Sequence, residues 1–492
     1  MTLGDVLDGV QVLSGLTETL RAAGVAGIAY DSRKAAPGFL FFAFPGAKAD
    51  GRQFASQAVE KGAVAVVSEL AAPDHFQGNW IQVGHGRRAL ARSAANFFGH
   101  PDQRLGVTGI TGTNGKTTTS YLADAVLRTA GFTTALIGTI EYRLAGAVLK
   151  AVNTTPESLD LFELFAQLEK AGGTHVTMET SSHALALGRV YGVQYHTTVF
   201  TNLTRDHLDF HKTMEEYFAA KQLLFTGNGA APPKFAVVNR DDAYGRALQT
   251  GPNTEVLWYG LDDGATARAR NISSGFEGLR FEIQYRDRSY PVESPLVGEI
   301  NVYNILASWC TGVSYGIDPA LVSRGIAACR AVPGRFERVE EGQPFLVVVD
   351  YAHTDDALRN VIAVARGLTS KRVITVFGCG GDRDRTKRPL MGMAAGEHSD
   401  FVVLTSDNPR SEDPLDIMND ALVGLRRFDT PHIAEPDRTT AIRKAVEEAQ
   451  PDDIVVIAGK GHETYQILKD QTIAFDDREV ARKVLHSLGY GK

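Results

Sequence analysis

The chain has 492 residues, too many for one ordinary hydrophobic core, and this length predicts about three domains of roughly 150 residues. Apolar residues make up 43% and charged residues 22%, which excludes a mostly disordered or fibrous protein. The net charge of −7 lacks the basic excess of a dedicated nucleic-acid binder. We therefore expect a folded protein that acts on small molecules.

The sequence indicates neither export nor membrane insertion. Its start, MTLGDVLDGVQVLSG, has no basic segment before a long apolar stretch, and no run of about 18 uncharged apolar residues occurs. The three cysteines, Cys310, Cys329 and Cys379, show no metal-type spacing, and so few thiols are typical of a reducing compartment. We expect a cytoplasmic protein.

Residues 1–104 predict a small α/β domain. VAGIAY, GFLFFAF and AVAVVSE are strand-like runs, and RRALARSAANFFGH has helical periodicity. Immediately afterwards, RLGVTGI leads into a cluster of Gly and Thr and then a helical pattern. This change indicates that a new domain begins at residue 105.

Residues 105–332 and 333–492 each predict a further α/β domain. In the first, strand-like runs such as TTALIGT, THVTMET and TTVFTNL alternate with helical runs such as SLDLFELFAQLEKAG, the pattern of a doubly wound, mainly parallel sheet. A Pro-Gly pair in AVPGRFERV precedes a third series, FLVVVDY, RVITVFG, FVVLTSD and DIVVIAG, each followed by a helical segment. The predicted fold class is α/β throughout.

The strongest chemical signal is the segment GITGTNGKTT between an apolar strand and a helix. Glycines let backbone N–H groups turn toward phosphate oxygens, Lys116 can contact the outer phosphates, and Thr117 can offer its hydroxyl to Mg²⁺. The strict Walker A spacing would place glycine where Ile110 stands, so the match rests on GTNGKT and its strand-turn-helix context. The alternative is an ordinary Gly-rich turn. The predicted nucleotide loop comprises Gly112, Thr113, Asn114, Gly115, Lys116, Thr117 and Thr118.

Two strands place metal-capable side chains near this loop. Glu179 ends one strand, and Asp206, His207 and Asp209 follow another. Ligands of doubly wound sheets bind at the carboxyl ends of the strands, and Mg²⁺ prefers oxygen ligands. Taken singly, Glu179 and His207 could equally be ordinary polar residues, but their placement relative to the loop predicts one shared crevice.

Ten segments together make the chain recognisable. They are GTNGKTTT, ETSSHAL, TNLTRDHLDFH, YFAAKQLLF, NVYNILAS, PGRFE, DYAHT, GCGGDRDRTKRPLMG, DNPRSEDP and GKGHETYQ. In this order they resemble the Mur ligases of peptidoglycan synthesis, most closely the members that add the third residue to UDP-N-acetylmuramoyl-L-alanyl-D-glutamate. The resemblance covers the chain from Asp31 to the final helix.

The resemblance implies an N-terminal UDP-binding domain, a central ATP-binding P-loop domain and a C-terminal Rossmann-like domain that carries the incoming amino acid. It implies that ATP phosphorylates the γ-carboxyl of the D-glutamate and that an amine attacks the acyl phosphate, giving an amide, ADP and phosphate. A carboxylate is a poor acylating agent until one oxygen becomes a phosphate leaving group. Lys116, magnesium and nearby cations would neutralise the transferred phosphoryl group.

Residue roles carry over with the resemblance. Lys221 resembles the lysine that bears a carbamate, the alternative being an unmodified lysine on a helix surface. The implied magnesium ligands are Thr117, Glu179, His207 and carbamylated Lys221. The implied ATP contacts outside the loop are Asn301, Asn304, Arg335 and Asp350, of which Arg335 would reach the phosphates, so that catalysis should require domain closure.

Both other substrates have implied contacts. Those for the UDP-muramoyl dipeptide are Tyr30, Ser32, Ala47, Lys48, Ala49, Asn153, Thr154, Thr155, Ser181 and Arg189. Members that use meso-diaminopimelate carry DNPR where lysine users replace the arginine, and a guanidinium can pair with the extra carboxylate. The implied diaminopimelate contacts are Arg383, Asp407, Asn408, Pro409, Arg410, Gly459 and Glu463. We expect a monomer that binds neither nucleic acid nor membrane.

Two alternatives to this ligase remain open. Folylpolyglutamate synthetase shares the P-loop and the modified lysine, but the N-terminal DSR segment and the DNPR segment argue against it. A regulatory or scaffold protein that binds nucleotide without turnover belongs to a different class. The presence of Lys116, Glu179, His207, Lys221 and Arg335 argues against such a loss of activity.

Overall fold

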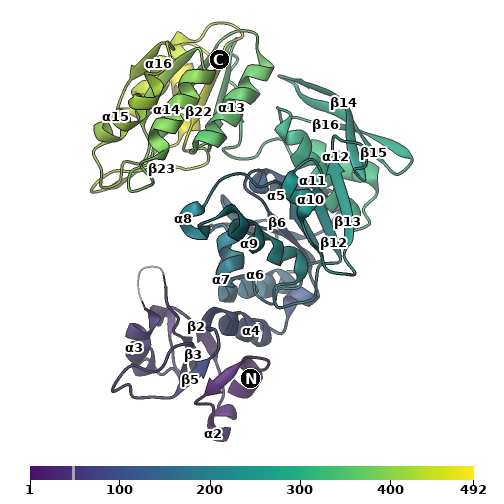
Figure 1. Ribbon diagram of the computed structural model, residues 1–492, viewed down its shortest axis with the longest axis vertical. Coiled ribbons are helices and arrows are strands. Elements are labelled where there is room, and N and C mark those ends of the chain that lie inside the picture. Colours follow the sequence, from purple (N-terminus) through teal and green to yellow (C-terminus); the bar gives the residue numbers. More distant parts are fainter. Residues whose placement is uncertain (47–49, 492) are drawn as a thin grey trace. The chain divides into compact units, whose positions relative to one another are not determined.

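The structure is a computed structural model that describes residues 1–46 and 50–491 (Figure 1). The chain forms two compact units. The first comprises Met1–Arg270, Glu282–Pro291 and Tyr303–Ala328, and the second comprises Asn271–Phe281, Val292–Val302 and the chain from Cys329 onward. Among the described residues, no helix is both long enough and apolar enough to cross a bilayer.

A five-stranded sheet begins the first unit. Its strands are β1 (Val12–Ser14), β2 (Gly27–Ala29), β3 (Phe39–Phe42), β4 (Ala65–Ser68) and β5 (Trp80–Val83). The order is β1-β5-β4-β3-β2, with β1 antiparallel to β5 and the other pairs parallel. Leu40 and Phe42 pack into one apolar cluster while Phe41 packs into another, so both faces of the sheet are covered. The helices here are α1 (Leu3–Val6), α2 (Glu18–Arg21), α3 (Ala55–Glu60) and α4 (Gly86–Phe98).

A second, larger sheet follows in the first unit. Its parallel strands are β7 (Thr134–Ile137), β10 (His175–Glu179), β6 (Gly106–Thr111), β11 (Thr197–Phe200), β12 (Phe235–Asn239) and β13 (Glu255–Gly260), in this spatial order. The antiparallel strands β8 (Glu141–Leu144) and β9 (Ala147–Lys150) extend it beyond β7. Beyond β13 come β14 (Ala267–Gly275), β15 (Gly278–Tyr285) and β16 (Arg288–Ser294).

Helices join the parallel strands as the alternating pattern predicts. They are α5 (Lys116–Thr129), α6 (Ser158–Lys170), α7 (Ser182–Leu187), α8 (Leu208–His211), α9 (Met214–Thr226) and α10 (Ala243–Ala247). Two further helices, α11 (Ile300–Ser314) and α12 (Pro319–Ala328), follow β16. In the sheet, Glu179 of β10 lies opposite Ile110, and Phe200 of β11 lies opposite Thr111. The carboxyl ends of three neighbouring strands therefore meet at one edge.

The second unit contains a six-stranded sheet in the order β17-β18-β22-β19-β20-β21. The strands are β17 (Glu337–Val339), β18 (Leu346–Asp350), β19 (Val373–Cys379), β20 (Phe401–Ser406), β21 (His432–Ala434) and β22 (Ile454–Ala458), of which β17 alone is antiparallel. A hairpin of β23 (Tyr465–Ile467) and β24 (Thr472–Ala474) follows β22.

Helices cover both faces of this sheet (Figure 1). Residues of α13 (Asp355–Leu368), α14 (Lys387–His398) and α15 (Pro414–Leu425) pack into one apolar cluster. Residues of α16 (Arg438–Glu448) and α17 (Asp477–Ser487) pack into the other. The predicted α/β fold class with mostly parallel sheets is confirmed, whereas the domain boundaries at residues 104 and 332 stay predictions.

Candidate active site

The nucleotide loop lies between β6, which ends at Thr111, and α5, which begins at Lys116. Gly112 and Gly115 have φ of +152° and +88°, a region that favours glycine. A Cβ atom on Gly112 would collide with Thr201, and one on Gly115 would collide with the Asn304 side chain. The loop is therefore packed against its surroundings, and it ends at a helix N-terminus, which is suited to bind phosphate.

Two lysines meet at this loop. Lys116 Nζ donates to the carbonyl oxygens of Gly112 and Thr113, each at 2.9 Å. Lys221 Nζ donates to the same Gly112 oxygen at 2.9 Å and lies 4.5 Å from the centre of the Tyr217 ring. Lys221 is only 1% exposed, which excludes the alternative of a lysine on the helix surface. Burial, and secondly the nearby Lys116 charge, hold the pKa of Lys221 well below its ordinary value.

The two predicted protein ligands that come from strand ends are both ordered. Glu179 is 1% exposed, and its carboxylate accepts hydrogen bonds from Thr139 N at 2.9 Å and Thr139 Oγ1 at 3.0 Å. His207 has φ of +54° and places Nε2 3.5 Å from Asp206 Oδ2. Burial lowers the pKa of His207 to about 4, so its ring is neutral at pH 7.

No three His, Cys, Asp or Glu side chains of the described chain form a group that could hold a metal by themselves. A metal at this edge would need other donors as well. In the predicted set, the other donors would be a carbamate on Lys221 and the hydroxyl of Thr117, the second residue of α5. The buried carboxylate of Glu179 is an oxygen donor of the type that Mg²⁺ prefers, whereas the neutral imidazole of His207 is a nitrogen donor, which hard cations bind less readily.

Three of the predicted muramoyl-peptide contacts lie around Glu179. Thr155 Oγ1 donates to the Glu179 carbonyl oxygen at 2.9 Å and accepts from Ser181 N at 3.0 Å. Thr154 Oγ1 lies 3.1 Å from Thr139 Oγ1, which also contacts the Glu179 carboxylate. The predicted peptide contacts and the predicted metal ligand are thus connected by hydrogen bonds.

Arg189, another predicted peptide contact, pairs with a carboxylate that the motifs did not identify. Its Nε lies 3.5 Å from Glu157 Oε2, and Arg87 Nε of α4 lies 3.3 Å from the same oxygen. Glu157 is 7% exposed. The sequence signal was present, because Glu157 follows the predicted contacts Asn153 to Thr155 by two residues in the segment NTTPE.

The predicted uridine contacts have partners within the first unit. Tyr30 OH donates to Asp160 Oδ2 at 2.5 Å, and the buried Ser32 Oγ donates to Gln57 Oε1 at 2.7 Å. Three further predicted contacts fall outside the described residues: Ala47, Lys48 and Ala49.

The second unit contains a cavity of about 360 Å³ lined by the predicted ATP residues Asn301 and Arg335. Arg330, Arg338 and Arg482 also line it, together with Glu337, Glu340 and apolar side chains. Charges of both signs therefore face the cavity. Asn304, the other predicted adenine contact, lies in the first unit against Gly115.

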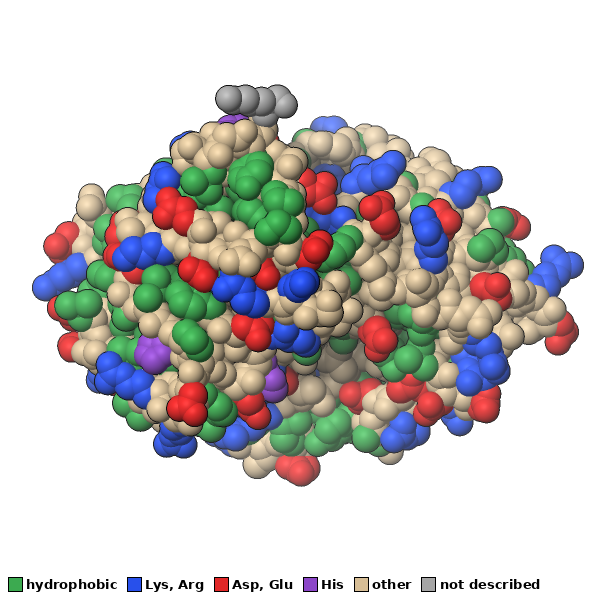
Figure 2. Space-filling view, turned by 90° about the horizontal axis from the view of Figure 1, so that it is seen from above, with side chains coloured by type: hydrophobic (Ala, Val, Ile, Leu, Met, Phe, Trp, Pro, Cys, Tyr) green, Lys and Arg blue, Asp and Glu red, His purple; other side chains and the backbone are tan. Residues whose placement is uncertain are grey.

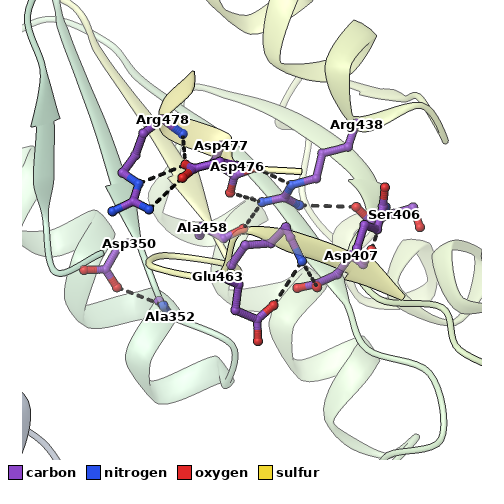
Figure 3. Close-up of polar contacts among 12 residues, drawn as sticks. Asp350, Ala352, Ser406, Asp407, Arg438, Ala458, Glu463, Asp476, Asp477 and Arg478 are labelled. Atoms are coloured by element: carbon purple, nitrogen blue, oxygen red, sulfur yellow. Dashed lines mark hydrogen bonds and ion pairs between the residues drawn. The ribbon is translucent and has the colours of Figure 1, made fainter. Parts of the chain in front are cut away.

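Asp350 ends β18 and is held by the backbone. Its Oδ2 accepts from Phe336 N at 2.7 Å and its Oδ1 from Ala352 N at 2.8 Å (Figure 3). Burial raises the pKa of this carboxyl, which the nearby Arg335 opposes. The side chain is therefore fixed at the carboxyl end of its strand, and its contact with ATP stays a prediction.

The predicted amino-acid contacts come together after β20 and β22. Asp407, Asn408 and Glu463 all face Lys460, a residue outside the predicted set. Gly459 has φ of +118°, and a Cβ atom there would lie 2.6 Å from Asp407 Oδ2. Glycine thus allows the loop after β22 to approach the loop after β20 closely.

Arg410 and Arg383 flank one glycine. A Cβ atom on Gly380 would lie 3.1 Å from Arg410 Nη1 and 3.6 Å from Arg383 Cγ. Arg410 has φ of +52°, its N–H donates to Ile467 O at 3.1 Å, and its Nη1 donates to Gly381 O at 2.7 Å. The two predicted arginines are therefore neighbours, on loops that follow β19 and β20.

Arg438 and Asp477 are functional candidates that the sequence did not reveal. Both are buried, and Arg438 donates to Asp477 through Nε at 2.7 Å and through Nη2 at 2.6 Å. The same guanidinium donates to Ser406 O at 3.3 Å and Ala458 O at 3.0 Å (Figure 3). It therefore ties together the carboxyl ends of β20 and β22, from which the amino-acid loops leave.

The visible surface carries charges of both signs. Figure 2 shows acidic and basic side chains interspersed, with no extended basic face in that view.

Comparison with known proteins gives a consistent result. Residues 24–98 match the Mur ligase family, catalytic domain; residues 110–312 match the Mur ligase middle domain; and residues 334–461 match the Mur ligase, glutamate ligase domain. The UDP-N-acetylmuramoyl-L-alanyl-D-glutamate--2,6-diaminopimelate ligase of Solibacter usitatus is 68% identical, over 100% of this chain and 99% of that protein. The ligase of the same name from Geobacillus thermodenitrificans is 46% identical, over 93% and 94% of the two chains.

Solved structures agree. A structure of a UDP-N-acetylmuramoyl-L-alanyl-D-glutamate--2,6-diaminopimelate ligase superimposes with a TM-score of 0.72 at 33% identity, covering 99% of both chains. A folylpolyglutamate synthase of Mycobacterium tuberculosis shares the fold at 17% identity and a TM-score of 0.60, covering 76% of this chain and 92% of that one. The motifs, the arrangement of their residues and these similarities together show that the chain belongs to the Mur ligase family.

Proposed function

We propose that this ligase joins meso-2,6-diaminopimelate to the D-glutamate γ-carboxyl of UDP-N-acetylmuramoyl-L-alanyl-D-glutamate, with ATP as the energy source. The observation that carries the proposal is the arrangement of Asp407, Asn408 and Glu463 around one buried lysine, on loops whose sequence distinguishes diaminopimelate users. Arg410 adjoins this group, because its Nη1 lies 3.4 Å from the Asn408 carbonyl oxygen. The relatives that carry this name at 68% and 46% identity support the same substrate.

The nucleotide would bind at residues 112–118 of the first unit. Lys116 now donates to two loop carbonyl oxygens, and the phosphates would offer it stronger acceptors. Asn301, Arg335 and Asp350 of the second unit would hold the base, phosphate and ribose. The transferred phosphoryl group gains charge in the transition state, and the fixed cations Lys116 and Arg335 would stabilise it.

Magnesium would supply neutralisation of phosphate charge, and Thr117, Glu179, His207 and a carbamate on Lys221 would hold it. Formation of the carbamate joins the neutral Lys221 amine to carbon dioxide and releases one proton. Support comes from the position of Lys221, which is buried beside Lys116 with no carboxylate bonded to its Nζ among the described residues. A carbamate would place a negative charge beside Lys116, where a protonated Lys221 would be repelled.

The peptide substrate would lie along Thr155, Ser181 and Arg189, with its γ-carboxylate toward the nucleotide loop. Phosphorylation converts a carboxylate oxygen into a leaving group. The unprotonated amine of diaminopimelate then attacks the carbonyl carbon, the C–O bond to phosphate breaks, and the amine loses a proton. Arg410 and Glu463 would hold the far end of the amino acid, so that the reacting amine points away from them.

The direct test is phosphate release with ATP and the UDP-dipeptide, in the presence of diaminopimelate, lysine or no amino acid. We expect release that depends on diaminopimelate, together with the tripeptide product by mass spectrometry. An additional arm with a folate and glutamate should be inactive. Phosphate release with folate and glutamate instead would indicate a folylpolyglutamate synthetase. Nucleotide binding without any phosphate release would indicate a non-catalytic protein. We also place the protein in the cytoplasm, as its few cysteines suggest. We propose a monomer, because every proposed contact lies on this one chain.

A further inference from the structure

Lys460 is a fully buried lysine in the centre of the proposed amino-acid site. Its side chain is 0% exposed, so it cannot itself contact an incoming substrate. Its Nζ lies 3.0 Å from Glu463 Oε2, 3.1 Å from Asn408 Oδ1 and 3.7 Å from Asp407 Oδ1. The ammonium donates hydrogen bonds to Glu463 and Asn408, and Asp407 lies within ion-pair distance.

The contacts of Lys460 decide how Asn408 is oriented. Asn408 Oδ1 accepts from Lys460 Nζ and, at 2.9 Å, from Ile467 N. Two donors occupy both lone pairs of this oxygen, so the amide nitrogen must face the other way. There, Nδ2 donates to Glu463 Oε2 at 3.0 Å. The amide is therefore engaged within the protein at both of its ends.

The same contacts give the two oxygens of the Glu463 carboxylate different surroundings. Oε2 accepts from both Lys460 and Asn408, whereas Oε1 accepts no hydrogen bond from any described residue. A carboxylate held through one oxygen keeps the other oriented for a ligand. This oxygen is suited to accept from an ammonium group.

We propose that Lys460 is a positioning residue that aims Glu463 Oε1 at the distal ammonium of the incoming amino acid, with Asn408 as its intermediary. The inference rests on the proposed function. It changes the expected role of Asn408. The side-chain oxygen of Asn408 already accepts two hydrogen bonds from the protein, so Asn408 supports Glu463 and does not contact the substrate through this oxygen.

Charge balance adds a reason for a lysine here. Asp407 and Glu463 carry two negative charges, and Lys460 lies 3.7 Å from the first carboxylate and 3.0 Å from the second. The predicted contacts Arg383 and Arg410 carry the further positive charges of the site. Without Lys460, two carboxylates would face each other across the site, and a substrate carboxylate near Arg410 would be repelled.

The test uses Lys460→Met, which keeps the length and removes the charge. Lys444→Met is the matched control, because Lys444 is an exposed lysine of the same unit that pairs with Glu435 at 2.5 Å. Initial rates are measured while diaminopimelate, ATP and the UDP-dipeptide are varied in turn. We expect the KM for diaminopimelate to rise roughly tenfold to a hundredfold in Lys460→Met. The other two KM values, and all three in the control, should stay within about twofold.

A double-mutant cycle tests the route of the effect. If Lys460 acts through Glu463, adding Lys460→Met to Glu463→Gln should lose far less than the product of the two separate losses. Fully multiplicative losses would contradict the inference. Asn408→Asp replaces the donor beside Glu463 by an oxygen, and it should show the same selective rise of the KM for diaminopimelate. This variant replaces Lys460→Met in the test if circular dichroism shows that Lys460→Met does not fold.

The outcomes separate the inference from the proposed function. A wild type that does not use diaminopimelate would refute the function. A wild type that uses it, with an unchanged diaminopimelate KM in the folded variants, would overturn the role of Lys460 alone. An equal rise of all three KM values would also overturn it, because that pattern indicates a general structural defect.

Discussion

Arg410→Ala is the substitution that tests substrate choice most directly. In the structure Arg410 Nη1 donates to Gly381 O at 2.7 Å, while Nε and Nη2 donate to no described residue. One edge of the guanidinium is thus anchored, and the other edge can receive a carboxylate with two parallel hydrogen bonds. Diaminopimelate has such a carboxylate at its far end, and lysine does not.

The size of the effect follows from those two bonds. A hydrogen bond to a charged group contributes about 1.5–3 kcal/mol, so losing two costs about 3 kcal/mol even at the lower limit. That value corresponds to a decrease on the order of a hundredfold in kcat/KM for diaminopimelate. Arg410→Lys keeps the charge but not the planar pair of donors, and we expect a loss between wild type and Arg410→Ala.

The assay is amino-acid-dependent phosphate release with diaminopimelate and with lysine. Arg443→Ala is the control, since Arg443 is an exposed arginine of α16 whose pair with Glu447 spans 3.6 Å. Lysine should be a poor substrate for the wild type, because it leaves Arg410 desolvated and unpaired. Equal use of both amino acids by the wild type, or an unchanged preference in Arg410→Ala, would refute the reasoning.

Three further predictions follow from the structure. Lys116→Ala should abolish phosphate release without unfolding the protein, because its contacts are to loop carbonyls; normal turnover would exclude the proposed phosphate role. Lys221→Ala should lose activity and regain part of it with acetate, and bicarbonate removal should slow the wild type; indifference to both treatments would contradict a carbamate. Arg388, which donates at 2.7 Å, lowers the pKa of Glu412 from its ordinary 4.5 to about 2. Stability from this pair is complete above pH 4.5 and is lost as the pH falls toward 2, so Glu412→Gln should flatten the decline of Tm over that interval; an unchanged decline would contradict this.

Sequence patterns were informative wherever a residue is constrained by the local chain. Apolar runs identified the central strands because both faces of a parallel sheet are buried. Glu179 could be placed because it directly ends such a run, and the register of β10 against β6 then puts it beside the nucleotide loop. Lys221 was recognisable only by resemblance, since nothing in a helical pattern distinguishes a buried lysine from an exposed one.

Side chains that act across the fold could not be predicted in this way. Arg438 is the first residue of α16, after the N-cap Asp437, and Asp477 is the first residue of α17 after Asp476. Charged residues at helix starts usually face water, so the sequence favours an exposed position for both. Only the packing of α16 and α17 against the same face of the sheet brings the two together in the interior.

The buried Arg438–Asp477 pair of the second unit contributes more to the position of two strand ends than to the stability of the fold. Removing an ion pair from water is costly, and apolar replacements of similar volume are often at least as stable. Here the Arg438 guanidinium also reaches the carbonyl oxygens of Ser406 and Ala458, the last residues of two strands that are separated by β19. An apolar side chain would fill the same space without fixing either strand end. Asp407 directly follows Ser406, and Lys460 lies two residues after Ala458. A shift of either strand end would therefore move the amino-acid contacts. We therefore infer that the Arg438–Asp477 pair fixes the two strand ends, and that Lys460 orients the site from this fixed position.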